Sequence, residues 1–127
     1  RSVSPAGSTH VLDIDGLKNE TIKFWSIWDN ENLIGCGAIK VLSDEYGEFK
    51  SIRVHDKFRE RGYGKKIISI LITKSRDIGI KNIFIETGSG KFFEPARKLF
   101  KSCGFEKCEP FSHYKNDPNS CYMKIKI

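Results

Sequence analysis

A short segment of the chain, Arg59-Glu60-Arg61-Gly62-Tyr63-Gly64-Lys65-Lys66, combines two glycines with four cationic side chains. The glycines carry no Cβ, so the backbone there can come close to a ligand. If a helix begins at this point, its first N–H groups and its dipole attract an anion. The segment therefore predicts a site for phosphate groups. Its candidate binding residues are Arg59, Arg61, Gly62, Tyr63, Gly64, Lys65 and Lys66.

Two common phosphate-binding motifs do not match this segment. A P-loop needs a glycine at position 59, where the chain has Arg59, and a serine or threonine at position 66, where it has Lys66. The dinucleotide fingerprint G-x-G-x-x-G needs a glycine at position 67, which is Ile67. The segment therefore predicts another kind of phosphate site.

The elements on both sides of this segment follow from hydrophobic periodicity. Glu48–Val54 alternates as a strand does, and the apolar residues between positions 67 and 72 recur with helical spacing up to a stop at Gly79. Ile83–Ile85 then forms a short buried strand. A strand, helix and strand in this order predict a right-handed parallel crossover over residues 48–86.

The rest of the chain supplies the remaining elements. We expect strands at Ile22–Trp28, Leu33–Leu42, Phe105–Cys108 and Cys121–Ile127, and a second helix from about Pro95 to Gly104. The order β-β-β-α-β-α-β-β predicts an α+β (mixed α/β) fold, with a mainly antiparallel sheet and helices on both of its faces.

Length and composition limit the protein class. The chain has 127 residues, so we expect a single domain over 1–127, and its 39% hydrophobic and 30% charged residues are typical of soluble globular proteins. The longest apolar run, Ile67–Thr73, is too short to span a bilayer. Residues 1–10 contain no apolar segment typical of a secretory signal. We therefore expect a cytoplasmic protein with no membrane partner.

Charge is distributed unevenly along the chain. Residues 1–48 hold 4 Lys/Arg against 8 Asp/Glu, and residues 49–127 hold 18 against 8. A basic half predicts either a solvated surface or a polyanionic partner, which could be nucleic acid, an anionic membrane or a phosphorylated cofactor. The glycine-rich segment favours the cofactor. Nucleic acid is not expected, because no RNA-recognition motif or helix-turn-helix can be identified.

The four cysteines are Cys36, Cys103, Cys108 and Cys121. No C-x-x-C pair is present, so we expect neither a metal site nor a redox motif. Free thiols in a reducing compartment are the favoured state.

Two signatures resemble the GNAT superfamily of N-acyltransferases. Arg59–Gly64 matches R-x-x-G-x-G, and it lies between the strand ending Ser51–Val54 and a basic amphipathic helix. Ala96–Phe105 is similar to the family's A-x-x-L-Y-x-x-x-G-F pattern. The resemblance covers residues 22–127. Glu86–Ser89 and the D-P-N-S-x-x-M sequence at 117–123 narrow it to a bacterial group of acetyltransferases whose acceptor is generally unassigned.

The resemblance implies acetyl-CoA as cosubstrate, bound between two splayed parallel strands that correspond to Glu48–Val54 and Ile83–Thr87. Backbone groups of Ile52, Arg53 and Val54 would bind the pantetheine, and the amides of residues 61–66 would bind the pyrophosphate. A primary amine would then attack the thioester directly in a ternary complex, with no acyl-enzyme.

The same resemblance implies catalytic carboxylates. Glu48, which lies 14 residues before Gly62, corresponds to the general base of some family members. Glu86, at the end of the other cleft strand, is the second candidate. Each could equally be a solvated residue, and we expect His55 and His113 to be solvated or structural.

Two positions depart from the family pattern. Phe100 stands where the family has the tyrosine that protonates the leaving thiolate, so water, Tyr114 or Ser89 would have to supply that proton. Phe93 replaces an asparagine common in this helix region. These changes leave a second function open, that of a CoA-binding domain with little or no activity.

The N-terminal region also departs from the family pattern, which usually opens with a strand and one or two helices. We expect residues 1–21 to supply only part of that region. The usual strand is expected to be missing, and Val11–Asn19 is expected to hold part of one helix. The strand Ile22–Trp28 would then be an exposed edge, and a homodimer is expected to cover it. The sequence does not identify the amine acceptor.

Overall fold

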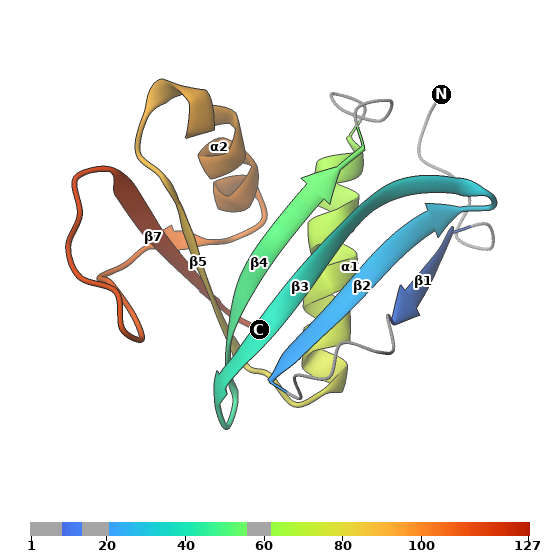
Figure 1. The fold of residues 1–127 in the computed structure, drawn as a ribbon, viewed down its shortest axis with the longest axis horizontal. Helices are drawn as coiled ribbons and strands as arrows, with labels where there is room; N and C mark the ends of the chain where they lie inside the picture. The colour runs from blue at the N-terminus through green and yellow to red at the C-terminus, as the bar shows by residue number, and fades with distance from the viewer. Residues whose placement is uncertain (1–8, 14–20, 56–61) are drawn as a thin grey trace.

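The structure is a computed structural model that describes residues 9–13, 21–55 and 62–127. Its elements, drawn in Figure 1, are β1 (Thr9–Asp13), β2 (Ile22–Asp29), β3 (Asn32–Ser43), β4 (Tyr46–Val54), α1 (Tyr63–Asp77), β5 (Asn82–Gly88), α2 (Glu94–Ser102), β6 (Glu106–Lys107) and β7 (Ser120–Lys126). A 3-10 turn, Lys91–Phe93, precedes α2. Every strand and helix that the sequence predicts after residue 21 is present.

The strands form one seven-stranded sheet in the order β1-β2-β3-β4-β5-β7-β6. The pair β4/β5 is parallel, and each of the other neighbouring pairs is antiparallel. The mixed, mainly antiparallel α+β fold with one central parallel pair is therefore confirmed.

The helix α1 packs on the sheet through the apolar stripe that predicts it. Ile67, Ile68 and Leu71 are fully buried and join one core with Ile83 and Phe49. The helix ends at Asp77, and Gly79 follows with φ of 94°, a conformation that glycine adopts without strain.

The helix α2 begins beside Pro95 and ends before Gly104, as its residue types predict. Gly104 has φ of 103°, and this turn directs the chain so that Phe105 is buried against Phe100, with 5.3 Å between ring centroids. This contact anchors α2 on the core next to α1.

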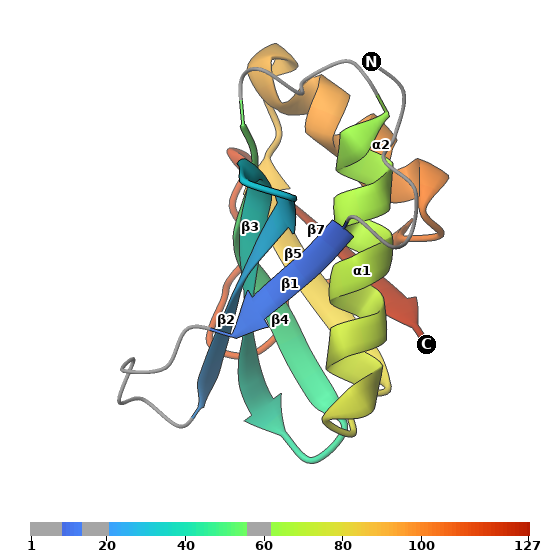
Figure 2. The same cartoon turned by 90° about the vertical axis from the view of Figure 1, so that its right-hand side faces the viewer.

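The helices lie on one face of the sheet, so the expectation of helices on both faces is wrong for the described residues. Figure 2 shows α1 and α2 on the same side, and the two helices contact each other. The connections from β4 to β5 and from β5 to β6 both run in the same direction across the sheet. Right-handed crossovers in one direction put both helices on the same face.

The N-terminal strand expected to be missing is present. Thr9–Asp13 pairs with β2 in five antiparallel positions, from Thr9 with Asp29 to Asp13 with Trp25. The edge of β2 is therefore covered within the chain, which removes the argument for a homodimer at that edge. Of the helix expected at Val11–Asn19, residues 11–13 are strand, and the remainder lies outside the described residues.

Candidate functional site

The parallel strands β4 and β5 pair over only three positions and then separate. The paired positions are Tyr46 with Asn82, Gly47 with Ile83, and Glu48 with Phe84. Beyond Glu48, β4 continues beside β3 alone and β5 continues beside β7 alone. The remaining backbone of β4 thus has no strand partner on its β5 side.

A bulge in β4 accompanies this separation. Cys36 pairs with Arg53 and Ala38 pairs with Lys50, so β4 has one more residue than β3 in this stretch. Ser51, within the stretch, has φ of 56°, which is unusual for a residue with a side chain. Such bulges bend a strand and increase its local twist, which turns β4 away from β5.

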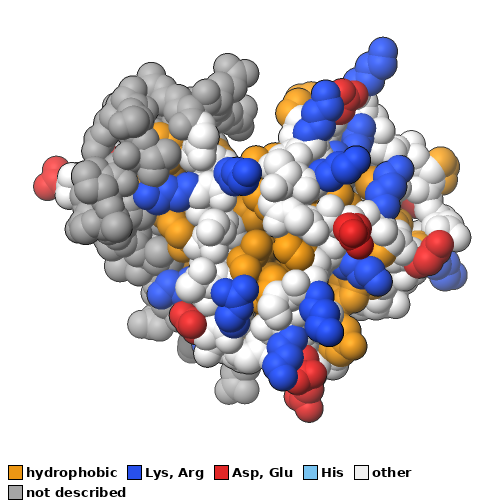
Figure 3. All heavy atoms as spheres, turned by 180° about the vertical axis from the view of Figure 1, so that it is seen from behind, with side chains coloured by type: hydrophobic (Ala, Val, Ile, Leu, Met, Phe, Trp, Pro, Cys, Tyr) orange, Lys and Arg blue, Asp and Glu red, His pale blue; other side chains and the backbone are white. Residues whose placement is uncertain are grey.

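The space between the separated strands is a cleft of about 530 Å³. It lies between β4, β5, α1 and α2, and Figure 3 shows the molecule from behind with a hollow at its upper edge. Hydrophobic side chains lie in the hollow, with Lys and Arg side chains nearby. The cleft is lined by Glu48, Phe49, Lys50, Ser51, Ile52, Arg53, Val54, Gly64, Ile68, Ile85, Glu86, Thr87, Phe93, Ala96, Leu99, Phe100 and Tyr114.

The N-terminus of α1 forms one end of this cleft. Gly62 is the N-cap residue with φ of 79°, and it has no side chain with which to cap the helix. A Cβ added to Gly64 would lie 2.8 Å from Cδ2 of Leu99, so the absence of a side chain lets α2 approach. The first turn of α1 contains no acidic residue, and it does contain Lys65 and Lys66. These features suit an anion.

The structure describes some, but not all, of the other residues that are predicted to bind the cofactor. Arg59 and Arg61 lie outside the described residues. Tyr63 has its side chain fully buried in the core, so a ligand could contact only its backbone. Ile52, Arg53 and Val54 all line the cleft along the unpaired side of β4.

Glu48 is a buried carboxylate at the point where the strands separate. Its side chain is 3% exposed. Its Oε2 accepts a hydrogen bond of 2.8 Å from the Tyr114 hydroxyl and lies 3.5 Å from Nζ of Lys50. These two contacts compensate for the loss of hydration of the charged carboxylate.

Tyr114 is held in place by other aromatic rings. Its ring contacts Phe111, Tyr122 and His113, with centroid distances of 5.1, 5.5 and 4.7 Å respectively. Burial first, and then the hydrogen bond and negative charge of Glu48, raise the pKa of Tyr114 well above its usual range. The hydroxyl therefore keeps its proton and remains a donor to Glu48.

Glu86, the second predicted carboxylate, lies in β5 at the other wall of the cleft. It is exposed, and its Oε2 accepts a hydrogen bond of 2.8 Å from the hydroxyl of Ser120. The cleft thus contains both predicted carboxylates, one of them buried and one exposed.

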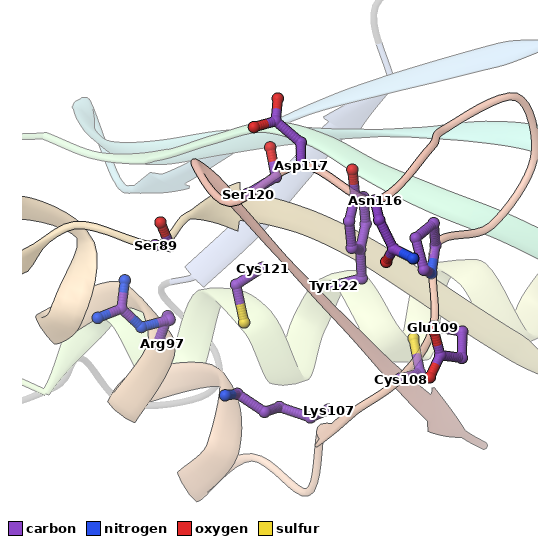
Figure 4. Close-up of a pocket in the computed structure, with 11 residues that line it drawn as sticks. Ser89, Arg97, Lys107, Cys108, Glu109, Asn116, Asp117, Ser120, Cys121 and Tyr122 are labelled. Atoms are coloured by element: carbon purple, nitrogen blue, oxygen red, sulfur yellow. The ribbon is translucent and has the colours of Figure 1, made fainter.

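The position of Tyr114 could not be assigned from the sequence, which offered it and Ser89 as alternative acids. The structure brings Tyr114 into the cleft, whereas Ser89 lines a separate cavity of about 320 Å³ with Arg97 and Tyr122 (Figure 4). Arg97 donates from one guanidinium nitrogen to the carbonyls of Gly88 and Gly90, at 2.6 and 2.9 Å. It thereby fixes the bend between β5 and α2, a role that its sequence position did not indicate.

The histidines and cysteines occupy positions outside the chemistry of the cleft. His55 and His113 are exposed, and neither lines the cleft. All four cysteines are free thiols, as predicted, and burial raises the pKa of Cys36 and of Cys108. In the part of the chain that the structure describes, no three His, Cys, Asp or Glu side chains form a group that could hold a metal ion.

Comparisons with known proteins extend this description. Residues 4–105 match the model of the acetyltransferase (GNAT) family. The chain is 42% identical over 125 residues to the uncharacterized N-acetyltransferase YsnE of Bacillus subtilis, covering 98% of this chain and 83% of that protein. It is 36% identical over 124 residues to the uncharacterized N-acetyltransferase YedL of Escherichia coli, covering 98% and 78%.

A solved structure shares the fold. It is the crystal structure of a GNAT family acetyltransferase from Elizabethkingia anophelis with acetyl-CoA bound, which superposes with a TM-score of 0.75 at 16% identity. The match covers 94% of this chain and 99% of that one. Among the described residues, no helix is both long and apolar enough to cross a membrane.

Proposed function

The chain belongs to the acetyltransferase (GNAT) family and is an acetyl-CoA-dependent N-acetyltransferase, and we propose that transfer takes place in the cleft between β4 and β5. The observation that carries this proposal is the separation of the two strands after Glu48. It leaves backbone groups of β4 facing a cleft that ends at the cationic N-terminus of α1, with a buried carboxylate at its apex.

The residues present fit acetyl-CoA. The backbone of Ile52–Val54 would pair with the pantetheine, and the first turn of α1 with Lys65 would bind the pyrophosphate. Apart from Gly62 and its two chain neighbours, no atom of the described residues lies within 4 Å of the place where a Cβ of Gly62 would stand, so phosphate oxygens can approach its backbone there. Arg59 and Arg61 remain predicted phosphate ligands from the sequence.

Glu48 is the proposed general base. Bound acetyl-CoA supplies a thioester, whose C–S bond breaks as the C–N bond to the amine forms. The ammonium group of the acceptor loses one proton to Glu48 before the attack, and the nitrogen loses a second proton to solvent water as the amide forms. General base catalysis of this kind contributes about 10²–10⁴ in rate.

Tyr114 is proposed to position Glu48. Its hydroxyl donates to Oε2, which leaves Oε1 to receive the proton of the amine. Phe100 lines the cleft but has no proton to give, and the raised pKa of Tyr114, caused first by burial, makes it a poor acid. We therefore assign the protonation of the leaving thiolate to water.

The alternative of a CoA-binding domain with little activity has less support. That alternative rests on Phe100, which cannot protonate the leaving thiolate. A thiolate whose conjugate acid has a pKa near that of cysteine, about 8.5, leaves with little help from an acid. A buried carboxylate with a fixed donor at the apex of the cleft supports catalysis.

Location and oligomeric state are also proposals. A cytoplasmic location is supported by four free thiols, which persist in a reducing compartment. The homodimer stays a prediction from the sequence, and its original argument no longer applies because β1 covers β2. Light scattering tests it, since the mass of a monomer would exclude the dimer.

Thermal unfolding with acetyl-CoA tests the proposed site, with ATP and NAD as control nucleotides. A ligand at 100 times its dissociation constant adds about 2.7 kcal/mol to the free energy of unfolding, which raises Tm by several degrees. We expect that rise with acetyl-CoA and a much smaller one with the controls. Equal shifts with all three would indicate a general polyanion site, and no shift would contradict the proposal.

A further inference from the structure

A second cavity adjoins the cleft next to Glu86 and Tyr114. It encloses about 430 Å³ and is formed by the end of β5 and the segment 113–122. Glu86 and Tyr114 line both this cavity and the cleft. Nearly all of its side chains are polar, and they are Glu86, His113, Tyr114, Lys115, Asn116, Asp117, Pro118, Ser120 and Tyr122. Glu86 and Tyr114, whose hydroxyl donates to Glu48, thus lie where the cavity meets the cleft.

Glu86 is a carboxylate of this cavity that has no cationic partner among the described residues. It is a carboxylate with a hydroxyl donor, Ser120, but no lysine or arginine of the described residues forms an ion pair with it. Two carboxylates, those of Glu48 and Glu86, thus lie near the junction of cleft and cavity. The one cation that pairs with either of them among the described residues, Lys50, is paired with Glu48.

The spacing of the two carboxylates is set by the sheet. Glu48 pairs in register with Phe84, and Glu86 is two residues further along the same strand. At a rise of about 3.3 Å per residue, the two positions are offset by about 7 Å along the strand direction. Side chains of alternate residues point to the same face, so both carboxylates border the position of Tyr114. With the spacing of about 4.8 Å between neighbouring strands, the two backbone positions lie at least about 8 Å apart, a distance that a short alkyl diamine with a carboxylate at each end can bridge.

We propose that the acceptor is a small diamine, with one amine at Glu48 and the second, still protonated, at Glu86. The proposal rests on the proposed function, because it assigns the acceptor of the same reaction. The amine at Glu48 gives up its proton and is acetylated, and the ammonium at Glu86 is unchanged throughout. Glu86 then acts as a specificity residue and not as a second base.

The other charged groups of the cavity agree with a cationic occupant. Asp117 adds a second carboxylate, although its Oδ1 accepts the amide of Asn119 at 2.8 Å. Lys115 is the one lysine or arginine among the lining residues, and it is exposed. A zwitterionic amino acid would instead place its carboxylate at Lys115.

Initial rates of CoA release with three acceptors test the proposal. They are diaminobutane, the matched monoamine butylamine, and alanine as a zwitterion. We expect kcat/KM for diaminobutane to exceed that for butylamine about three- to tenfold, since a partly exposed ion pair contributes modestly. Raising the salt concentration should reduce this preference.

Three variants identify the residue responsible. Glu86→Gln should lower kcat/KM for diaminobutane to about the value that the same variant shows with butylamine, so that the preference is lost. Glu106→Gln, an exposed glutamate of β6, is the matched control and should keep the preference. Ser120→Ala, which removes the donor to Glu86, should reduce the preference in part.

Other outcomes would overturn the proposal and leave the proposed function intact. A loss of rate with every amine in Glu86→Gln would make Glu86 a base or a structural residue. Preference for alanine, lost in Lys115→Met, would assign a zwitterionic acceptor. Equal rates for diaminobutane and butylamine would show that Glu86 selects nothing. Absence of acetyl-CoA binding, by contrast, would contradict the proposed function itself.

Discussion

Tyr114 donates a hydrogen bond from its hydroxyl to Oε2 of Glu48 over 2.8 Å, joining residues 66 positions apart in the chain. Glu48 lies at the last paired position of β4 and β5, and Tyr114 lies in the connection between β6 and β7. The connection packs on the sheet through the stacked rings of Phe84 and Phe111, 4.8 Å apart. The orientation of the carboxylate in the cleft therefore depends on how this connection folds.

Replacement of Tyr114 by phenylalanine should lower the rate of acetyl transfer. The hydroxyl holds the carboxylate of Glu48 in place, and a hydrogen bond to a charged group contributes about 1.5–3 kcal/mol. We expect kcat to fall about tenfold or more in Tyr114→Phe, with the Kd for acetyl-CoA little changed. Tyr46→Phe, on the same strand as Glu48 but outside the cleft, is the control. A kcat equal to that of the wild type would argue against a positioning role.

Alkaline stability should also depend on Tyr114. Its pKa is raised in the folded protein, first by burial and then by Glu48, whereas in the unfolded chain it is about 10. Above that pH the unfolded tyrosine ionises and the folded one does not, so the free energy of unfolding falls as pH rises. Urea unfolding of Tyr114→Phe should show a smaller decline between about pH 9 and 11. An identical decline in wild type and variant would contradict this account.

Gly64 should tolerate a side chain poorly because of Leu99. A Cβ at this position would lie 2.8 Å from Cδ2 of Leu99, which must move. Only the end of that side chain has to shift, so we expect Gly64→Ala to lower the free energy of unfolding by about 1 kcal/mol and to weaken acetyl-CoA binding, since Leu99 lines the cleft.

A double-mutant cycle tests the cause. In Gly64→Ala/Leu99→Ala the clash is absent, so the two effects should be less than additive. Additive losses would mean that the strain lies elsewhere.

Lys65 should contribute to binding of the cofactor through its position in the first turn of α1. An exposed ion pair between a lysine and a phosphate group contributes up to about 1 kcal/mol, so Lys65→Gln should raise the Kd for acetyl-CoA about two- to fivefold. Lys74→Gln, in the last turn of the same helix, should leave the Kd unchanged. Calorimetry at low salt measures both. Equal effects of the two substitutions would point to long-range charge and not to a site at the N-terminus.

Local patterns were sufficient to predict most of the fold. The stripe at Ile67, Ile68 and Leu71 is the buried face of α1, and the glycines at 79 and 104 follow helix ends, where they have positive φ. Glu48 was predicted to begin the cleft strand and lies in the cleft, although β4 begins two residues earlier, at Tyr46.

What the sequence could not predict depends on non-local pairing. Thr9–Asp13 shows no alternation of apolar and polar residues, and its pairing with β2 defines it as a strand. Both helices share one face because the crossovers from β4 to β5 and from β5 to β6 run in the same direction across the sheet, and no local pattern encodes that order. Tyr114 reaches Glu48 through the packing of Phe111, and its spacing from other residues carried no signal of this contact.

The rate of acetyl transfer by Glu48→Gln tests the central claim most directly. The substitution preserves the shape of the side chain and removes its ability to accept a proton, and Glu45→Gln in the preceding turn is the control. We predict a fall in kcat of about 10²-fold or more, with the Kd for acetyl-CoA and the Tm little changed. A variant that binds acetyl-CoA normally and retains the wild-type kcat would contradict the assignment of Glu48 as the base.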